Sequence, residues 1–98
     1  MLHIINKAPL ERNSFDSCVR VARSGTILLI EDAVYAATRG NAAEAKVKDA
    51  MTRFKVCVLG PDLEARGMGD RLIEGVQSVG YDGFVDLVAT EPNCQSWV

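Results

Sequence analysis

Apolar runs recur along the chain at intervals that predict a series of short strands. Three are clear, LHIIN at 2–6, TILLI at 26–30 and FKVCVLG at 54–60, and a weaker one lies within 72–80. The run at 26–30 is apolar throughout rather than alternating, which is typical of a strand buried on both faces. Strands of this kind belong to parallel sheets covered by helices, so these runs favour a layered α/β fold.

The segment between the first two strands has the period of an amphipathic helix. Asn13 or Ser14 is expected at its N-cap, and Asp16 lies in the first turn, where the helix dipole favours a negative charge. Gly25 is expected to end the helix. Four apolar residues share one helical face at i, i+3, i+4 and i+7, namely Phe15, Cys18, Val19 and Ala22.

Four further segments read as helical. The stretch at 31–41 opens with acids and closes with Arg39 and Gly40, and 42–53 is rich in helix formers. A single helical turn followed by a loop is expected at 61–70. The segment at 81–92 predicts a last helix ended by Pro92, with one side formed by Phe84, Leu87 and Val88. No helix or strand is expected in the tail NCQSWV that follows it.

Strands and helices therefore alternate along the chain, with a weaker fourth strand before the last helix. Alternation of this kind predicts right-handed crossovers and parallel pairing. The predicted fold class is α/β: a single compact three-layer domain over residues 1–98, with a short, mostly parallel sheet flanked by helices. A length of 98 residues provides one core rather than two.

Charge and composition exclude several classes of function. The 11 basic residues are scattered and the net charge is −2, so the sequence lacks the basic block of a nucleic-acid-binding protein. No run approaches the roughly 20 apolar residues that span a bilayer. The first residues lack the pattern of a secretory signal. We therefore expect a cytoplasmic protein without tight, direct binding to nucleic acid.

The sequence offers little for metal or cofactor chemistry. The turn after the first strand, KAPLERNS, has no glycine for a phosphate group. Glu31 and Asp32 follow the second strand, where α/β proteins place ligands, and a metal or acid–base role is open to them. Interaction with the start of the following helix is the favoured role. His3 lies inside a strand and is expected to be structural. No cofactor is expected.

Three cysteines, Cys18, Cys57 and Cys94, form neither a disulfide framework nor a zinc spacing. Cys57 lies in the middle of a strand and is expected in the core, whereas Cys94 is near the tail. Cys18 has two interpretations. Its spacing with Phe15 argues for burial and an inert thiol. Its position near a helix start argues for a thiolate, which Arg12 and Arg20 would favour.

Several segments together resemble a known family. They are MLHIINKAPLERNSFDSCVRVA, ILLIEDAVYAA, LGPDLEARG, YDGFVDLV and the terminal QSW. Nearly end to end, the chain resembles the TusB/DsrH family of sulfur-relay proteins, small members of the DsrE-like α/β group. The combination of LGPDLEARG with a terminal tryptophan is its most specific feature. The segment ERNSFDSC is closer to the DsrH side.

The resemblance implies a subunit of a heterohexamer with TusC/DsrF-type and TusD/DsrE-type chains. Such a complex passes persulfide sulfur to a TusE/DsrC-type carrier, for sulfur oxidation or for 2-thiolation of the tRNA wobble uridine. The principal sulfur-carrying cysteine of these assemblies belongs to the TusD/DsrE-type chain, and Cys18 is a candidate second persulfide site. This chemistry needs an accessible thiolate and neither metal nor nucleotide.

Two alternatives stand beside a sulfur-carrying subunit: a purely structural or docking subunit without chemistry, and, with little support, a lone small-molecule-binding domain. Trp97 is an interface candidate, or it folds the tail onto its own domain. Arg66 in LEARG is a second interface candidate. Physical reasoning slightly favours an ordinary solvated arginine there, whereas the family motif points to a structural role in its loop.

Overall fold

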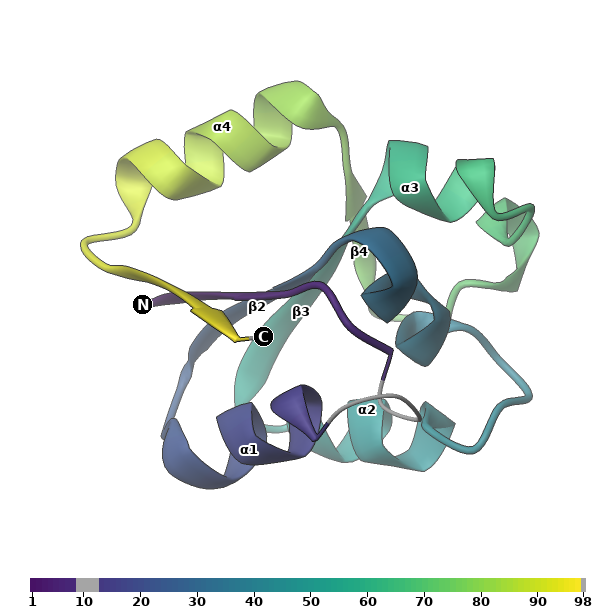
Figure 1. Ribbon diagram of the computed structural model, residues 1–98, viewed down its shortest axis with the longest axis horizontal. Coiled ribbons are helices and arrows are strands. Elements are labelled where there is room, and N and C mark those ends of the chain that lie inside the picture. Colours follow the sequence, from purple (N-terminus) through teal and green to yellow (C-terminus); the bar gives the residue numbers. More distant parts are fainter. Residues whose placement is uncertain (9–12, 98) are drawn as a thin grey trace.

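A computed structural model describes residues 1–8 and 13–97 and contains one five-stranded sheet (Figure 1). All neighbouring strands pair in parallel, in the order β4-β3-β2-β1-β5. Their bounds are Leu2–Ile5 for β1, Gly25–Leu29 for β2, Phe54–Leu59 for β3, Gln77–Val79 for β4 and Cys94–Trp97 for β5. The predicted α/β class is confirmed.

The helical segments lie where the sequence predicts them, with shorter bounds. The α-helices are α1 at Ser14–Val21, α2 at Glu44–Ala50, α3 at Gly60–Ala65 and α4 at Tyr81–Thr90. The segments η1 at Glu31–Ala37 and η2 at Gly69–Arg71 are 3₁₀-helices. Pro61 stands in the first turn of α3, where its missing N–H costs nothing.

The strand order divides the helices between the two faces of the sheet. From β1 to β4 every connection moves to the next strand on the same side, so right-handed crossovers keep these connections on one face. The last connection returns from β4 to the far side of β1 and places α4 on the opposite face. Figure 1 shows α1 and α2 on one side of the sheet and α4 on the other.

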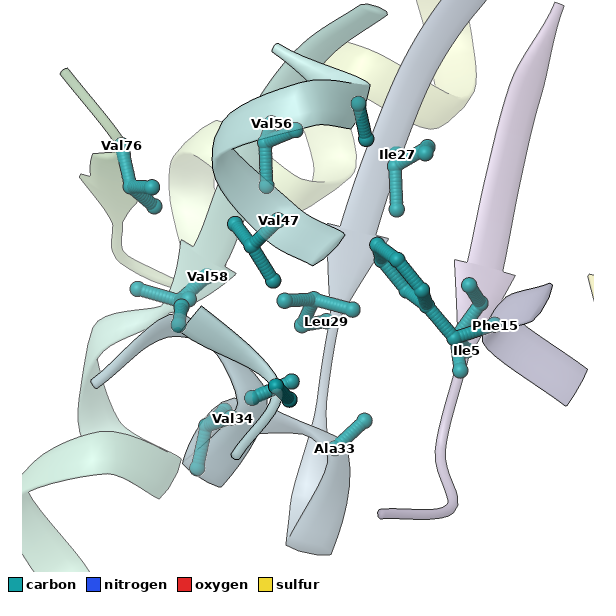
Figure 2. Packing of buried hydrophobic residues seen from close by; sticks show 14 of the residues in the cluster. Ile5, Phe15, Ile27, Leu29, Ala33, Val34, Val47, Val56, Val58 and Val76 are labelled. Atoms are coloured by element: carbon teal, nitrogen blue, oxygen red, sulfur yellow. The ribbon is translucent and has the colours of Figure 1, made fainter. Parts of the chain in front are cut away.

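The two faces are covered unequally. The larger buried cluster joins the strands to α1, η1 and α2, and Figure 2 shows Phe15 of α1 beside Ile5 of β1 within it. Among the described residues the opposite face has one small buried cluster, Leu2, Leu28 and Cys57, with Phe84 and Leu87 of α4 packed against it. A single helix of ten residues therefore covers a sheet of five strands.

The tail contradicts the expectation that it forms no element. Residues Cys94–Trp97 form β5, which pairs with β1 so that Leu2 lies opposite Cys94 and Ile5 opposite Trp97. The N–H of Leu2 also donates to the carbonyl of Asn93 at 2.8 Å. Only four residues long and largely exposed, this edge strand has no apolar periodicity to predict it.

Gly25 does not end the first helix, as the sequence suggested. The helix ends at Val21, and Gly25 is instead the first residue of β2, with φ +125°. A Cβ at this position would lie 2.4 Å from the carbonyl oxygen of Met1. Glycine is therefore required because the start of β1 passes directly over it.

None of the helices in residues 1–8 and 13–97 is long and apolar enough to cross a bilayer.

Candidate functional site

Cys18 lies in the main core rather than at the surface. Its side chain on α1 is 0% exposed, and with Phe15 it belongs to the cluster beneath the sheet. Burial raises the pKa of the Cys18 thiol to about 11. Arg12 lies outside the described residues, and Arg20 is exposed. In this packing the thiol is neither accessible nor ionised, so its role as a persulfide carrier stays a prediction.

The other two thiols differ from each other as the sequence suggests. Cys57 is buried in β3 on the face that α4 covers, and burial raises its pKa. Cys94 is exposed at the start of β5. Cys94 is thus the accessible thiol of the three.

Arg66 is partly buried and ion-paired, so its interpretation as an ordinary solvated arginine is wrong. Its Nε and Nη2 atoms donate to Oδ1 of Asp32 at 3.1 and 2.9 Å, and Nη1 donates to the carbonyl of Asp62 at 3.1 Å. The side chain is 23% exposed. Arg66 therefore fastens α3 to η1 at the carboxyl edge of the sheet, the structural role that the LEARG motif indicates.

The same edge contains a strained residue that the sequence did not reveal. Glu31 has φ +51°, a left-handed conformation that non-glycine residues adopt at a cost. Its N–H donates to Oδ2 of Asp62 at 2.6 Å, which holds the turn in place. Glu31 and Asp32 begin a helical segment, as expected, but neither caps it with a side-chain hydrogen bond within the described part of the chain. Asp32 instead binds Arg66.

Trp97 folds onto its own domain through His3. Its indole Nε1 donates to Nδ1 of His3 at 3.2 Å, and the half-buried ring packs against the main core. His3 is buried, and its Nε2 reaches no partner in good hydrogen-bonding geometry among the described residues. Trp97 as an anchor for another chain stays a prediction.

The pKa of His3 is lowered, chiefly by burial and further by the N-terminal ammonium. The backbone of Ser24 and the carboxylate of Glu91 act in the opposite direction and offset part of the shift. Trp97 donates to Nδ1, so the neutral ring is the form that the fold uses.

We expect the free energy of unfolding to decrease as the pH is lowered, because of His3. In the unfolded chain His3 binds a proton near pH 6.5, and in the folded chain it does so only at lower pH. The stability that the neutral ring contributes is therefore fully present above about pH 6.5 and is lost as the pH falls below it. The slope between pH 7 and 5 reaches at most about 1.4 kcal/mol per pH unit for one proton. Urea unfolding, followed by the fluorescence of the single Trp97, measures it. His3→Gln, in the only histidine, should flatten this slope; equal slopes in both proteins would contradict the assignment.

The outer face of α4 exposes an apolar stripe. Tyr81, Val85 and Val88 are 61, 64 and 45% exposed, and they follow one another at i, i+4 and i+7. With Phe84 and Ala89, Val85 and Val88 line a shallow apolar hollow. The grouping of Val88 with Phe84 and Leu87 is therefore only partly correct, because Val88 faces outward.

The segment that carries this stripe has charged side chains of one sign, a signal that sequence reasoning missed. Residues 72–98 contain four acids, Glu74, Asp82, Asp86 and Glu91, and not one lysine, arginine or histidine. All the basic residues lie in 1–71. An apolar stripe with an acidic border is a common composition for a protein-binding surface.

The described part of the chain contains no cluster of three or more His, Cys, Asp or Glu side chains placed to hold a metal ion. The chemistry-bearing groups that it does contain are separate: a buried thiol on α1, an ion pair at the carboxyl edge, and the His3–Trp97 pair at the β1–β5 edge.

Known proteins with the same fold include the ychN protein from Escherichia coli. Its crystal structure matches with a TM-score of 0.81 and covers 98% of this chain and 97% of that one. At 19% identity this likeness shows the fold alone.

Sequence similarity extends over the whole chain. Protein TusB of Erwinia tasmaniensis is 33% identical over 99 residues, and protein TusB of Escherichia coli strain K12 is 31% identical over 98. Each match covers 99% of this chain and 100% of the relative. The family model described as DsrH like protein matches residues 7–94. The chain therefore belongs to the TusB/DsrH family.

Proposed function

We propose that this chain is a subunit of a cytoplasmic sulfur-relay complex, in which persulfide sulfur passes to a TusE/DsrC-type carrier. Its membership of the TusB/DsrH family supports the proposal. Its partners are subunits of the TusC/DsrF type and of the TusD/DsrE type, and two copies of each of the three chains form a heterohexamer. The sulfur serves sulfur oxidation or 2-thiolation of the tRNA wobble uridine.

Within this complex the chain acts as a docking subunit. The observation that carries this role is the apolar stripe of Tyr81, Val85 and Val88 on α4, which covers one face of the sheet. Contiguous exposed apolar patches on protein surfaces mark sites where another protein binds. Its acidic border, with Asp82 and Asp86, favours a partner surface that is apolar at its centre and basic at its edge.

The position of Cys18 favours docking over sulfur carriage. Persulfide transfer requires a thiolate that a donor and an acceptor can both reach. With a pKa of about 11, roughly one Cys18 in a thousand is ionised at pH 8. The thiol is also fully covered, so neither a donor nor an acceptor can reach it in this packing. Cys18 therefore serves packing in this arrangement.

Co-expression tests the proposal. An affinity-tagged chain should co-purify with subunits of the TusC/DsrF and TusD/DsrE types, and native mass spectrometry should give two copies of each chain. A folded chain that stays alone in the presence of both partners would overturn the proposal. Loss of 2-thiouridine from tRNA on deletion of the gene identifies the tRNA branch, and unchanged tRNA identifies the oxidation branch.

A further inference from the structure

A pocket of about 400 Å³ opens above the carboxyl ends of three neighbouring strands. One wall comes from the loop after η1, which follows β2. A second comes from Met68 and Arg71, which follow β3, and Ala8 beyond β1 completes it. Ligands of open α/β sheets bind at this edge, and a volume of this size accommodates a small organic molecule.

The lining divides into an apolar interior and a cationic rim. Ala36 and Ala43 are buried, and with Tyr35 and Met68 they provide an aromatic ring, a thioether and two methyl groups. The charged residues among the described lining are Arg39 and Arg71. Behind this rim, the carboxylate of Glu44 interacts with Arg39 and accepts a hydrogen bond from the N–H of Gly40 at 2.7 Å. The pocket therefore offers an apolar space that ends at two guanidinium groups.

The rim is held in shape by the protein itself. The N–H of Arg39 donates to the carbonyl of Arg71 at 2.7 Å, and Nη2 of Arg39 donates to the carbonyl of Asp70 at 2.7 Å. Below it, the amide of Asn41 donates to the carbonyl of Tyr35 at 2.9 Å and to Oγ1 of Thr38 at 2.8 Å. A ligand would therefore meet a preformed site and spend little binding energy on ordering the loop.

The two arginines also border a second, polar hollow. It is lined by Arg39, Gly40, Asp70 and Arg71, so the Asp70 carboxylate partly offsets the positive charge there. Gly40 has φ +87° and open space where a Cβ would stand, and its N–H donates to Oε1 of Glu44 at 2.7 Å, so this turn adds no backbone donor for a ligand. One anionic group suits this rim better than a multiply charged phosphate, because the net charge is small.

We propose that this pocket binds a small organic acid, with its apolar body against Tyr35 and Met68 and its carboxylate at Arg39 and Arg71. Guanidinium groups bind carboxylates through charge-assisted, paired hydrogen bonds. The apolar interior selects acids that carry an aryl or alkyl group over acetate. This site is independent of the docking surface on α4 and of the sulfur-relay proposal.

Titration of the ¹⁵N-labelled full chain with 4-phenylbutyrate, followed by amide NMR, tests the site. We expect saturable shifts at Arg39, Gly40 and Met68, with at least tenfold weaker binding of the neutral 4-phenylbutyramide and of acetate. Arg71→Gln, which keeps the contacts of Arg39, should weaken phenylbutyrate at least tenfold. Arg20→Gln makes the same change of charge at an exposed position of α1, and this control should leave the affinity unchanged.

Three results would overturn this inference. They are equal binding of the acid and its amide, unchanged affinity in Arg71→Gln, and shifts confined to α4 or absent altogether. Each is distinct from a failure of the docking proposal, because the titration uses the isolated chain and reports the residues that the ligand contacts.

Discussion

Replacing Val85 by aspartate is expected to abolish co-purification with the partner subunits while the domain stays folded. Val85 is 64% exposed at the centre of the α4 stripe, so the folded monomer loses little when it changes. In the complex the new carboxylate would be buried without a partner. That costs about 3 kcal/mol or more, which is roughly a hundredfold in Kd.

Val21→Asp is the matched control for this experiment. Val21 is 67% exposed on α1, on the other side of the sheet, and its replacement makes the same change of side chain and charge. Pull-down from co-expressing cells should retain both partners with Val21→Asp and lose them with Val85→Asp, at equal melting temperatures. Retention of both partners by Val85→Asp would place the interface elsewhere.

Gly25→Ala is expected to destabilise the domain by about 3 kcal/mol or more. A residue with a side chain is strained at φ +125°, and the added Cβ would collide with the Met1 carbonyl oxygen at 2.4 Å. The same oxygen accepts a hydrogen bond from the N–H of Thr26 at 3.0 Å. The substitution therefore forces β1 away from β2 at the centre of the sheet.

Urea denaturation of Gly25→Ala, compared with Gly69→Ala, measures this effect. At Gly69 the backbone is not left-handed, and a new Cβ would meet only the flexible side chain of Glu64 at 3.6 Å. Gly69→Ala should change the free energy of unfolding by no more than about 1 kcal/mol. Similar stabilities of the two variants would show that β1 does not approach Gly25 as described.

The layered fold could be predicted because its signals are local. Apolar runs at 2–6, 26–30 and 54–60 are long enough to read as buried strands, and the segments between them carry helical periodicity. Helical spacing puts Phe15 and Cys18 on one face of α1, and both are buried. Alternation of the elements then leaves few topologies.

Features that depend on distant parts of the chain were missed. β5 forms because its backbone pairs with β1, more than 80 residues away, and its own side chains are mostly exposed. The role of Gly25 is set by Met1, and that of Arg66 by Asp32. Periodicity and composition carry no trace of such pairings, because they arise only when the sheet assembles.

The candidate site shows the same limit. Sequence reasoning left Cys18 between a buried thiol and a reactive one, since its apolar neighbours and its helix-start position point in opposite directions. The structure shows how the first effect exceeds the second: desolvation acts on a side chain that is 0% exposed, and the pKa rises to about 11. The α4 stripe was overlooked because Val88 was counted on the inner face.

Sulfur mapping on the native protein tests the central claim, that this chain docks in the complex and that its Cys18 packs the core and carries no sulfur. The co-purified complex is exposed to a persulfide donor near pH 7.5, and Cys18, Cys57 and Cys94 are each mapped by peptide mass spectrometry. We expect no sulfur on Cys18 in the folded chain, whether or not Cys94 is labelled, and labelling of Cys18 once urea unfolds it. A gain of one sulfur atom on Cys18 in the folded chain, absent in Cys18→Ser, would show that this thiol accepts sulfur and make α1 a relay site.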